Sequence, residues 1–278
     1  RLCRDWSSDV CSSDLTILEA GPRPLGPFDE EMVDLLTKAS AAEGIETHCN
    51  VAITRIAKIG RAYTVATQDG RRFEADLVVN GAGRAPDIDE LDLARAGVEY
   101  SRRGIAVDGQ MTTTNPQVYA VGDCAATIQL ARVGDAEAHV AAETIASRHY
   151  GGQSEASMDY RVVPAVLFTY PQYGMVGKTE QALKDKAAAY ERSFAKELDW
   201  PTYKRAGMRS AAYKLLVDKH GQLLGAHILS DNAAGLINTF TLAMTNRIAV
   251  DDLYRQSVMA PYPSRESDII YILKPLLT

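Results

Sequence analysis

Thr112-Thr-Thr-Asn-Pro-Gln-Val-Tyr-Ala-Val-Gly-Asp123 is the most informative segment of this sequence. Its apolar run from Val118 to Val121 ends at Gly122, a pattern that predicts a short buried strand and then a tight turn. Asp123 is therefore expected at the carboxyl end of a strand, where ligands bind in open α/β sheets. A carboxylate at that place accepts hydrogen bonds from a chain of sugar-like hydroxyls. The alternative is an ordinary turn with a solvated aspartate.

Another segment of the same kind lies upstream, Asp76-Leu-Val-Val-Asn-Gly-Ala-Gly-Arg-Ala-Pro86. Its apolar run, Leu77 to Val79, predicts a strand. Small residues interrupt the pattern at Gly81 and Gly83, where another backbone or a ligand could approach closely.

Together, these two segments resemble the pyridine nucleotide-disulfide oxidoreductases. The segment that ends at Asp123 is similar to the family's second flavin-binding motif, which implies that Gly122 and Asp123 hold the ribityl chain of FAD. The upstream segment is similar to the "ATGRxPN" signature, and Gly81, Gly83, Arg84 and Pro86 match it, whereas Asn80 and Asp87 depart from it. The resemblance implies an α/β fold, with a partial Rossmann-like FAD/NAD(P)-binding portion followed by an α+β dimerisation domain.

The segment that begins at Thr16 is typical of the second half of a βαβ unit. A short strand ends at Glu19, and Asp29 is a predicted N-cap of a helix that stops at Gly44. In dinucleotide-binding folds, the acid at this strand end accepts hydrogen bonds from the adenosine ribose. Glu19 therefore favours NADH over NADPH, because a carboxylate repels a 2′-phosphate. Arg23 is the counter-argument, since a guanidinium pairs with phosphate. A surface charge at a strand end is the alternative for Glu19.

The carboxyl-terminal part resembles the interface domain of the same family, which residues 163–180 enter. A hairpin is expected from Tyr213 to Ser230, followed by a helix from Ala233 to Thr245, with the helices on one face of one sheet. In relatives this domain forms a two-fold dimer, so a homodimer is expected. His227 lies inside the hairpin and is expected to be a packed strand residue rather than a catalyst.

The expected acid–base pair departs from the family pattern. Where relatives carry "HPTxxE", this chain has Tyr262-Pro-Ser-Arg-Glu-Ser267, so that Tyr262 replaces the histidine and Glu266 stands one residue before the expected glutamate. A phenol with a pKa of about 10 is a poor base at neutral pH but donates a hydrogen bond. Tyr262 and Glu266 are the candidate catalytic residues. The alternative is that this segment only starts the final helix.

The expected organisation has four parts. Residues 1–15 (RLCRDWSSDVCSSDL) have no helical or strand period and are interpreted as a non-native leader that includes Cys3 and Cys11. A partial NAD(P)-binding domain is expected at 16–80, the carboxyl-terminal part of the FAD-binding domain at 81–152, and the dimerisation domain at 153–278.

Composition argues against nucleic-acid binding, a membrane span and a metal site. A net charge of −6 with both signs interspersed gives no basic face for nucleic acid. Apolar runs are shorter than the ~20 residues of a membrane span. The four cysteines form no metal-ligand cluster or CxxC pair, which predicts no metal site and a cytoplasmic protein.

The sequence therefore predicts part of a flavin-dependent oxidoreductase that passes electrons from NAD(P)H through FAD to a disulfide-type or related small-molecule acceptor. By itself this chain is expected not to turn over, because the glycine-rich pyrophosphate loops and the CxxxxC redox pair of the family are not found in it. The alternative is a non-catalytic dimerisation module or pseudo-enzyme of the same fold.

Overall fold

The computed structural model describes residues 14–277. Most of the predicted leader, with Cys3 and Cys11, lies outside the described residues, and the first strand begins at Leu15. The chain divides into two compact units. The first unit combines the residues before Val79 with those after Arg161, and the second runs from Val79 to Arg161. The nucleotide-type segment and the carboxyl-terminal domain thus belong to one unit.

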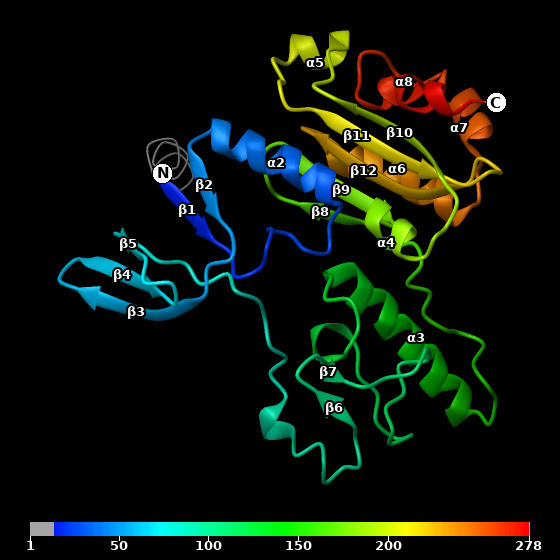
Figure 1. Cartoon of the computed structure of the whole chain (residues 1–278). Coiled ribbons are helices and arrows are strands. Elements are labelled where there is room, and N and C mark those ends of the chain that lie inside the picture. Colours follow the sequence, from blue (N-terminus) through cyan, green and yellow to red (C-terminus); the bar gives the residue numbers. More distant parts are fainter. Residues whose placement is uncertain (1–13, 278) are drawn as a thin grey trace, which may run out of the picture. The chain divides into compact units, whose positions relative to one another are not determined.

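The first unit begins with a parallel strand pair joined by a helix, as the sequence predicts for half a βαβ unit (Figure 1). Asp29 caps the helix by accepting a hydrogen bond from the Met32 amide. Gly44, at a φ of 86°, follows its end. A three-stranded antiparallel sheet comes next. The elements are β1 (Leu15–Leu18), α2 (Glu30–Ala42), β2 (Ile45–His48), β3 (Ile53–Ile59), β4 (Ala62–Thr67) and β5 (Arg72–Ala75).

The carboxyl-terminal part of this unit is a five-stranded antiparallel sheet in the order β10-β11-β12-β9-β8. Its strands are β8 (Ala165–Leu167), β9 (Gln172–Gly177), β10 (Glu191–Lys196), β11 (Ala212–Val217) and β12 (Leu223–Ser230). Its helices are α4 (Glu180–Asp185), α5 (Pro201–Arg205), α6 (Ala233–Thr245), α7 (Val250–Ser257) and α8 (Ile269–Leu273), with short 3₁₀ turns η3 (Glu266–Asp268) and η4 (Lys274–Leu276). The predicted hairpin and the helix over 233–245 are confirmed.

Both faces of this sheet are covered, which differs from the prediction of helices on one face. Tyr213 and Leu215 of β11 pack in a core with α6, α7 and α8. Ala212 of β11 and Leu229 of β12 pack instead with Met32 and Leu36 of α2. Since successive strand residues point to opposite faces, α2 and α6 lie on opposite sides (Figure 1). Every residue of β11 is therefore buried.

A buried ionic cluster fastens α2 to this sheet. The Lys214 ammonium lies 2.7 Å from Asp29 Oδ1, 2.8 Å from Glu31 Oε2 and 2.9 Å from Glu180 Oε2. Only 1% of the Lys214 side chain is exposed, so its charge depends on these partners. Asp29 also accepts a hydrogen bond from the Glu180 amide, at the start of α4. One carboxylate thus serves the amino ends of both α2 and α4, where a negative charge is favoured.

His227 lies beside this cluster as a fully buried strand residue, which confirms the prediction. Its Nε2 is 3.1 Å from the Lys178 carbonyl, which only accepts, so Nε2 carries the proton. Its Nδ1 then accepts from the Tyr173 hydroxyl at 3.2 Å. Burial lowers the pKa of His227, which agrees with a neutral ring in this arrangement.

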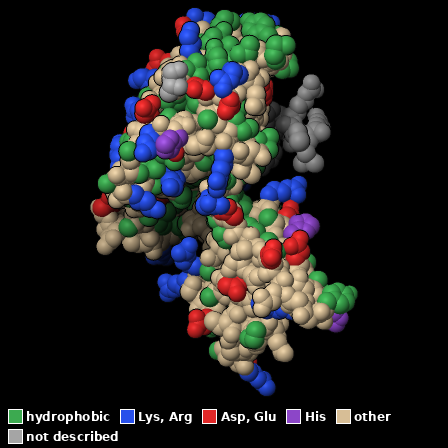
Figure 2. All heavy atoms as spheres, turned by 90° about the vertical axis from the view of Figure 1, so that its right-hand side faces the viewer, with side chains coloured by type: hydrophobic (Ala, Val, Ile, Leu, Met, Phe, Trp, Pro, Cys, Tyr) green, Lys and Arg blue, Asp and Glu red, His purple; other side chains and the backbone are tan. Residues whose placement is uncertain are grey.

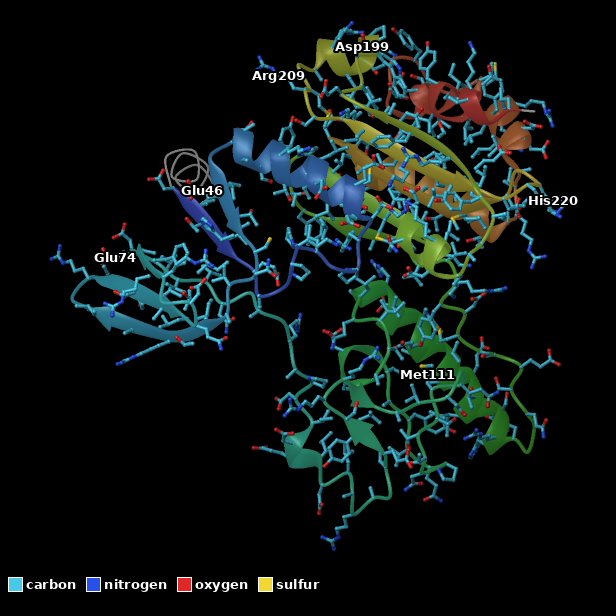
Figure 3. All side chains as sticks on the ribbon, viewed as in Figure 1. Glu46, Glu74, Met111, Asp199, Arg209 and His220 are labelled. Carbon is cyan, nitrogen blue, oxygen red and sulfur yellow. The ribbon has the colours of Figure 1, made fainter. Side chains whose placement is uncertain are left out.

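The second unit packs one long helix against irregular chain. Its elements are η1 (Asp89–Leu91), β6 (Tyr100–Ser101), β7 (Gly104–Ile105), η2 (Gly122–Cys124) and α3 (Ala131–His149). Ile88, Val98, Ile105 and Ala125 belong to its small core. Met111 is buried in the interior of the same unit (Figure 3).

Two predicted strands are wrong. Residues 77–79 have no strand structure, and Leu77 and Val79 are 72% and 80% exposed. The run from Val118 to Val121 forms only a single bridge, between Thr112 and Tyr119. A strand needs a neighbour for its backbone hydrogen bonds. Among the described residues, the run at 77–79 has none, and the run at 118–121 is joined to residues 111–113 only by the Thr113 amide to the Val118 carbonyl and the Ala120 amide to the Met111 carbonyl.

Acidic and basic side chains are interspersed over the face of the molecule shown in Figure 2, as the composition suggests. Among the described residues, none of the helices is both long and apolar enough to cross a membrane.

Candidate functional site

The turn that carries Asp123 is built by Gly122. Val121 is extended, with φ −140° and ψ 156°, and Gly122 then takes a φ of 70°, a left-handed conformation that favours glycine. The chain continues as η2, closed by a hydrogen bond from the Ala125 amide to the Gly122 carbonyl. The Asp123 side chain remains 48% exposed. The turn therefore presents a half-exposed carboxylate.

Helix α3 packs against this turn and is hydrogen-bonded to it through Glu137. The Gly122 amide donates to Glu137 Oε2 at 2.6 Å, and the Tyr160 hydroxyl donates to Glu137 Oε1 at 2.7 Å. Glu137 is fully buried. A Cβ added at Gly134 would lie 3.1 Å from the Gly122 Cα, so the helix and the turn make close backbone contact. The direction of Asp123 is thus fixed by neighbours that the motif itself does not contain.

Arg84 is brought to Asp123 from the upstream motif. Its Nη2 lies 3.4 Å from Asp123 Oδ2, and its side chain is 79% exposed. Gly83 adopts a φ of 108°, which requires glycine, and Asn80 Oδ1 accepts a hydrogen bond from the Ala82 amide. Gly81 has no positive φ, so its backbone conformation does not require glycine. The structure therefore joins the two motifs through an ion pair that solvent reaches.

The amino end of α3 follows the Asp123 turn directly. Its N-cap is Leu130, which makes no side-chain capping hydrogen bond, and its first turn contains no acidic residue. An uncapped helix start keeps amide donors and a partial positive charge. Next to a carboxylate that accepts from hydroxyls, this gives a donor and an acceptor for one polar ligand.

Glu19 directly follows β1, at the strand end where the sequence places it, and is half-buried. Its Oε1 accepts a hydrogen bond from the Gly21 amide at 2.7 Å. Among the described residues this is the only hydrogen bond of the carboxylate. Glu19 therefore keeps capacity to accept from hydroxyls.

The Arg23 side chain is hydrogen-bonded to the loop that follows it, residues 24–28. Its guanidinium donates to the carbonyls of Leu25, Gly26 and Phe28 at 3.2, 2.7 and 3.1 Å. Both terminal nitrogens take part in these bonds, so the side chain organises the chain ahead of α2.

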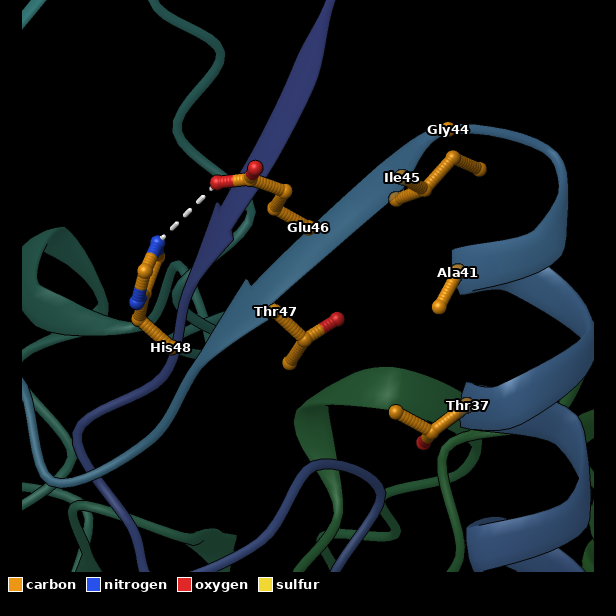
Figure 4. A pocket seen from close by; sticks show the side chains of 7 residues that line it. All are labelled: Thr37, Ala41, Gly44, Ile45, Glu46, Thr47 and His48. Carbon is orange, nitrogen blue, oxygen red and sulfur yellow. Dashed lines mark ion pairs between the residues drawn. The ribbon is translucent and has the colours of Figure 1, made fainter.

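A shallow hollow lies between α2 and β2 (Figure 4). Thr37 and Ala41 of the helix face Ile45 and Thr47 of the strand across it. Glu46 and His48 point to the other side of β2, where His48 Nε2 is 3.5 Å from Glu46 Oε2. The residues that line the hollow include none of the predicted site residues.

Among the described residues, no hydrogen bond joins Tyr262 and Glu266. Tyr262 is 68% exposed, whereas the Glu266 carboxylate accepts a hydrogen bond from Asn232 Nδ2, at the N-cap of α6, at 2.7 Å. Ser267, at the family's glutamate position, hydrogen-bonds Ser264. Glu266 is therefore engaged in the local structure of the loop.

The segment after Tyr262 is firmly anchored. Arg265 donates two hydrogen bonds to the Asp231 carboxylate, at 2.7 and 2.8 Å, and its guanidinium lies 3.8 Å from the Tyr203 ring centroid. Asp268 is buried and accepts from the Thr202 hydroxyl. Tyr262 is thus an exposed aromatic residue that precedes a segment held in place by these hydrogen bonds.

Sequence reasoning missed Glu137, Tyr160 and Lys214. Signals for two of them were present. Glu137 shares the helical spacing of buried Val133 and Ala141, and Lys214 interrupts an apolar strand. A charge within an apolar pattern indicates a buried partner. Tyr160 gave no such signal.

Comparison with known families and proteins gives a consistent result. Residues 7–139 match the model described as pyridine nucleotide-disulphide oxidoreductase, and residues 163–268 match the dimerisation domain of the same family. A dihydrolipoyl dehydrogenase of Cupriavidus necator is 32% identical over 261 residues, 91% of this chain and 53% of that protein. A mercuric reductase of Bacillus cereus is 31% identical, over 90% of this chain and 39% of that protein. An uncharacterised 19.7 kDa protein of a Staphylococcus aureus mercuric resistance operon is 35% identical over its whole length, 66% of this chain.

Solved structures agree at the level of the fold. LpdA of Mycobacterium tuberculosis superposes with a TM-score of 0.84 at 24% identity, over 96% of this chain and 57% of that one. The HOCl-induced flavoprotein disulfide reductase RclA of Escherichia coli gives 0.85 at 21% identity, over 95% and 60%. The chain thus spans about half the length of the dihydrolipoyl dehydrogenases that it matches. The predicted fold class, a Rossmann-like portion followed by a dimerisation domain, is confirmed.

Proposed function

This chain belongs to the pyridine nucleotide-disulphide oxidoreductase family, and we propose that it is the part of a flavin-dependent NAD(P)H oxidoreductase that holds the ribityl arm of FAD through Asp123. FAD supplies two-electron chemistry between NAD(P)H and a disulfide-type or related acceptor. Similarity to dihydrolipoyl dehydrogenases and a mercuric reductase over most of the chain favours this proposal over a non-catalytic module. We place the protein in the cytoplasm.

The observation that carries the proposal is the half-exposed Asp123 carboxylate on its glycine turn, directly before the uncapped start of α3. The carboxylate accepts hydrogen bonds from hydroxyls, and the helix amides donate to electron-rich ligand atoms. These residues fit the sugar-alcohol arm and the adjoining polar edge of a flavin. Arg84 shields the carboxylate only through one exposed contact, which a ligand hydroxyl displaces at little cost.

Titration of FAD with the chain, followed by flavin fluorescence, tests the proposal. The unsubstituted chain is expected to bind FAD, and Asp123→Asn is expected to bind about tenfold more weakly, or about 1.4 kcal/mol, because charge-assisted hydrogen bonds are lost. Asp89→Asn changes an exposed carboxylate of the same unit and is the matched control. A chain that binds no FAD, or an Asp123→Asn chain that binds as well as the control, would overturn it.

We further propose that NADH, rather than NADPH, is the favoured nucleotide. Glu19 keeps capacity for ribose hydroxyls, and the guanidinium of Arg23, the nearby cation that could pair with a 2′-phosphate, is occupied by main-chain carbonyls. In titrations of the same protein, NADH is expected to bind more tightly than NADPH, with Glu19→Ala removing the difference.

The dimerisation domain supports a homodimer, in which we propose that Tyr262 reaches the partner's acceptor site as a hydrogen-bond donor. Tyr262 is 68% exposed, and Met259 and Val258 beside it are 89% and 55% exposed. Apolar residues exposed together in this way are typical of an interface. Glu266 is assigned a local structural role in this proposal, because its carboxylate is bonded to Asn232.

A further inference from the structure

We propose that Glu137 is a positioning residue for the Asp123 turn, and that Tyr160 holds the Glu137 carboxylate in place. The inference rests on the proposed function, because it concerns the carboxylate that would bind the flavin. It identifies how the second unit keeps that carboxylate in one orientation.

The first step concerns the geometry of the Gly122 amide. Gly122 has a left-handed φ, and its N–H points into the unit, where Glu137 Oε2 accepts it at 2.6 Å. Asp123 is the next residue, so rotation of the peptide before Gly122 would redirect it. The close approach of Gly134 to Gly122 packs the turn tightly against α3. Glu137 therefore acts on Asp123 through one backbone amide.

The second step concerns the charge of Glu137. The side chain is fully buried, and no Lys or Arg among the described residues forms an ion pair with it. A buried carboxylate requires hydrogen-bond donors to remain stable. Here the donors are the Gly122 amide and the Tyr160 hydroxyl, one for each oxygen. Loss of either donor leaves one carboxylate oxygen buried without a partner.

The third step concerns Tyr160. Burial and the Glu137 carboxylate raise the pKa of the Tyr160 hydroxyl, so it stays protonated and donates throughout the neutral range. The chain that brings Tyr160 to this place is itself ordered. The Met158 amide donates to the Gly109 carbonyl at 2.8 Å, and Gln110 Nε2 donates to the Ser154 carbonyl at 2.8 Å. The segment between α3 and β8 thus contributes a group that supports the flavin turn.

Substitution separates positioning from general stability. Glu137→Ala removes the acceptor of the Gly122 amide. Glu137→Gln keeps a carbonyl oxygen that accepts from that amide, and its NH₂ group donates a hydrogen bond to the Tyr160 oxygen. Tyr160→Phe removes only the hydroxyl that donates to the other oxygen of Glu137. Thr144→Ala is the matched control, because Thr144 is buried on the same helix and bonds only the Val140 carbonyl.

Two measurements on the 278-residue chain test the inference: hydrogen exchange of the Gly122 amide by NMR and FAD affinity. We expect Glu137→Ala to accelerate exchange at Gly122 at least tenfold and to weaken FAD binding at least tenfold. We expect Tyr160→Phe to have smaller effects in the same direction and Glu137→Gln to restore most of both. Thr144→Ala is expected to lower the melting temperature without changing Gly122 exchange relative to its neighbours.

The outcomes distinguish this inference from the proposed function. Slow Gly122 exchange in Glu137→Ala would overturn the positioning role, whether or not FAD binds. Equal acceleration at Gly122 in Thr144→Ala would also overturn it, because general loosening would then explain the result. Fast exchange in Glu137→Ala together with no FAD binding to the unsubstituted chain would support the positioning of the turn and contradict the flavin assignment.

Discussion

Two groups of ion pairs in this molecule, one buried and one exposed, both join cations to carboxylates but have different consequences. The Lys214 cluster in the first unit is buried, and the three donors of its ammonium face three carboxylates within 2.9 Å. The Arg84–Asp123 pair in the second unit has one contact at 3.4 Å, and both side chains are exposed. The comparison teaches that saturated buried charges hold elements together, whereas an exposed and unsaturated carboxylate is available to a ligand.

The largest expected effect is on the buried cluster. Lys214→Met is expected to lower the free energy of unfolding by about 3–5 kcal/mol, because Asp29 and Glu180 would be left buried without their cation. Urea denaturation measures this change. Lys204→Met is the control, since its pair with Asp199 is exposed, and it is expected to cost less than about 1 kcal/mol. Equal losses in the two variants would show that burial does not distinguish these ion pairs.

An intermediate effect on the free energy of unfolding is expected when the pH is lowered. Burial opposes ionisation of Glu180, but hydrogen bonds from Lys214 and Tyr190 outweigh it and lower the pKa to about 2, from 4.5. The pKa of Asp29 is also lowered: burial opposes this, and the hydrogen bond and positive charge of Lys214 outweigh it. A carboxyl group whose pKa is lower in the folded state contributes stability above its unfolded pKa and loses it as pH falls through the folded value.

The free energy of unfolding is therefore expected to fall between about pH 5 and pH 2, by on the order of 2 kcal/mol for Glu180 alone. Denaturation at a series of pH values measures it. Glu180→Gln is expected to flatten the slope in this window. A variant that keeps the full slope would assign the acid sensitivity to other carboxyl groups.

The smallest effect on stability is expected at the exposed pair. Arg84→Ala is expected to change the free energy of unfolding by less than about 1 kcal/mol, because both charges remain hydrated without each other. Thermal denaturation tests this, with Arg132→Ala as a control, since Arg132 forms an exposed pair with Asp135 on α3. A loss well above that of the control would mean that the Arg84–Asp123 pair holds the fold and is not primarily a ligand site.

Local signals explain which elements could be predicted. Asp29 and Thr179 have the residue types and positions of helix caps, and both side chains accept the expected amide. The turn at residues 218–222 connects β11 and β12 as the pattern indicates. Such features depend on residues within a few positions of each other, so the sequence displays them directly.

The failures have a different cause. The runs at 77–79 and 118–121 have apolar β-type composition, but strand structure depends on a neighbouring chain that composition does not reveal. Tyr262 and Glu266 are candidate catalytic residues from their places in a motif, and that role stays a prediction. In the structure Asn232, far away in the chain, takes the Glu266 carboxylate.

The sequence by itself determined the family-like motifs, the helix caps and the hairpin, and it singled out Asp123 as a candidate ligand residue, because each is encoded in a short run of neighbours. Only the tertiary structure decided what surrounds those residues. Lys214 meets Asp29 across 185 positions and Glu137 meets Gly122 across 15. The physical reason is that a buried charge must find its partners wherever the fold brings them, and that choice belongs to packing rather than to sequence spacing.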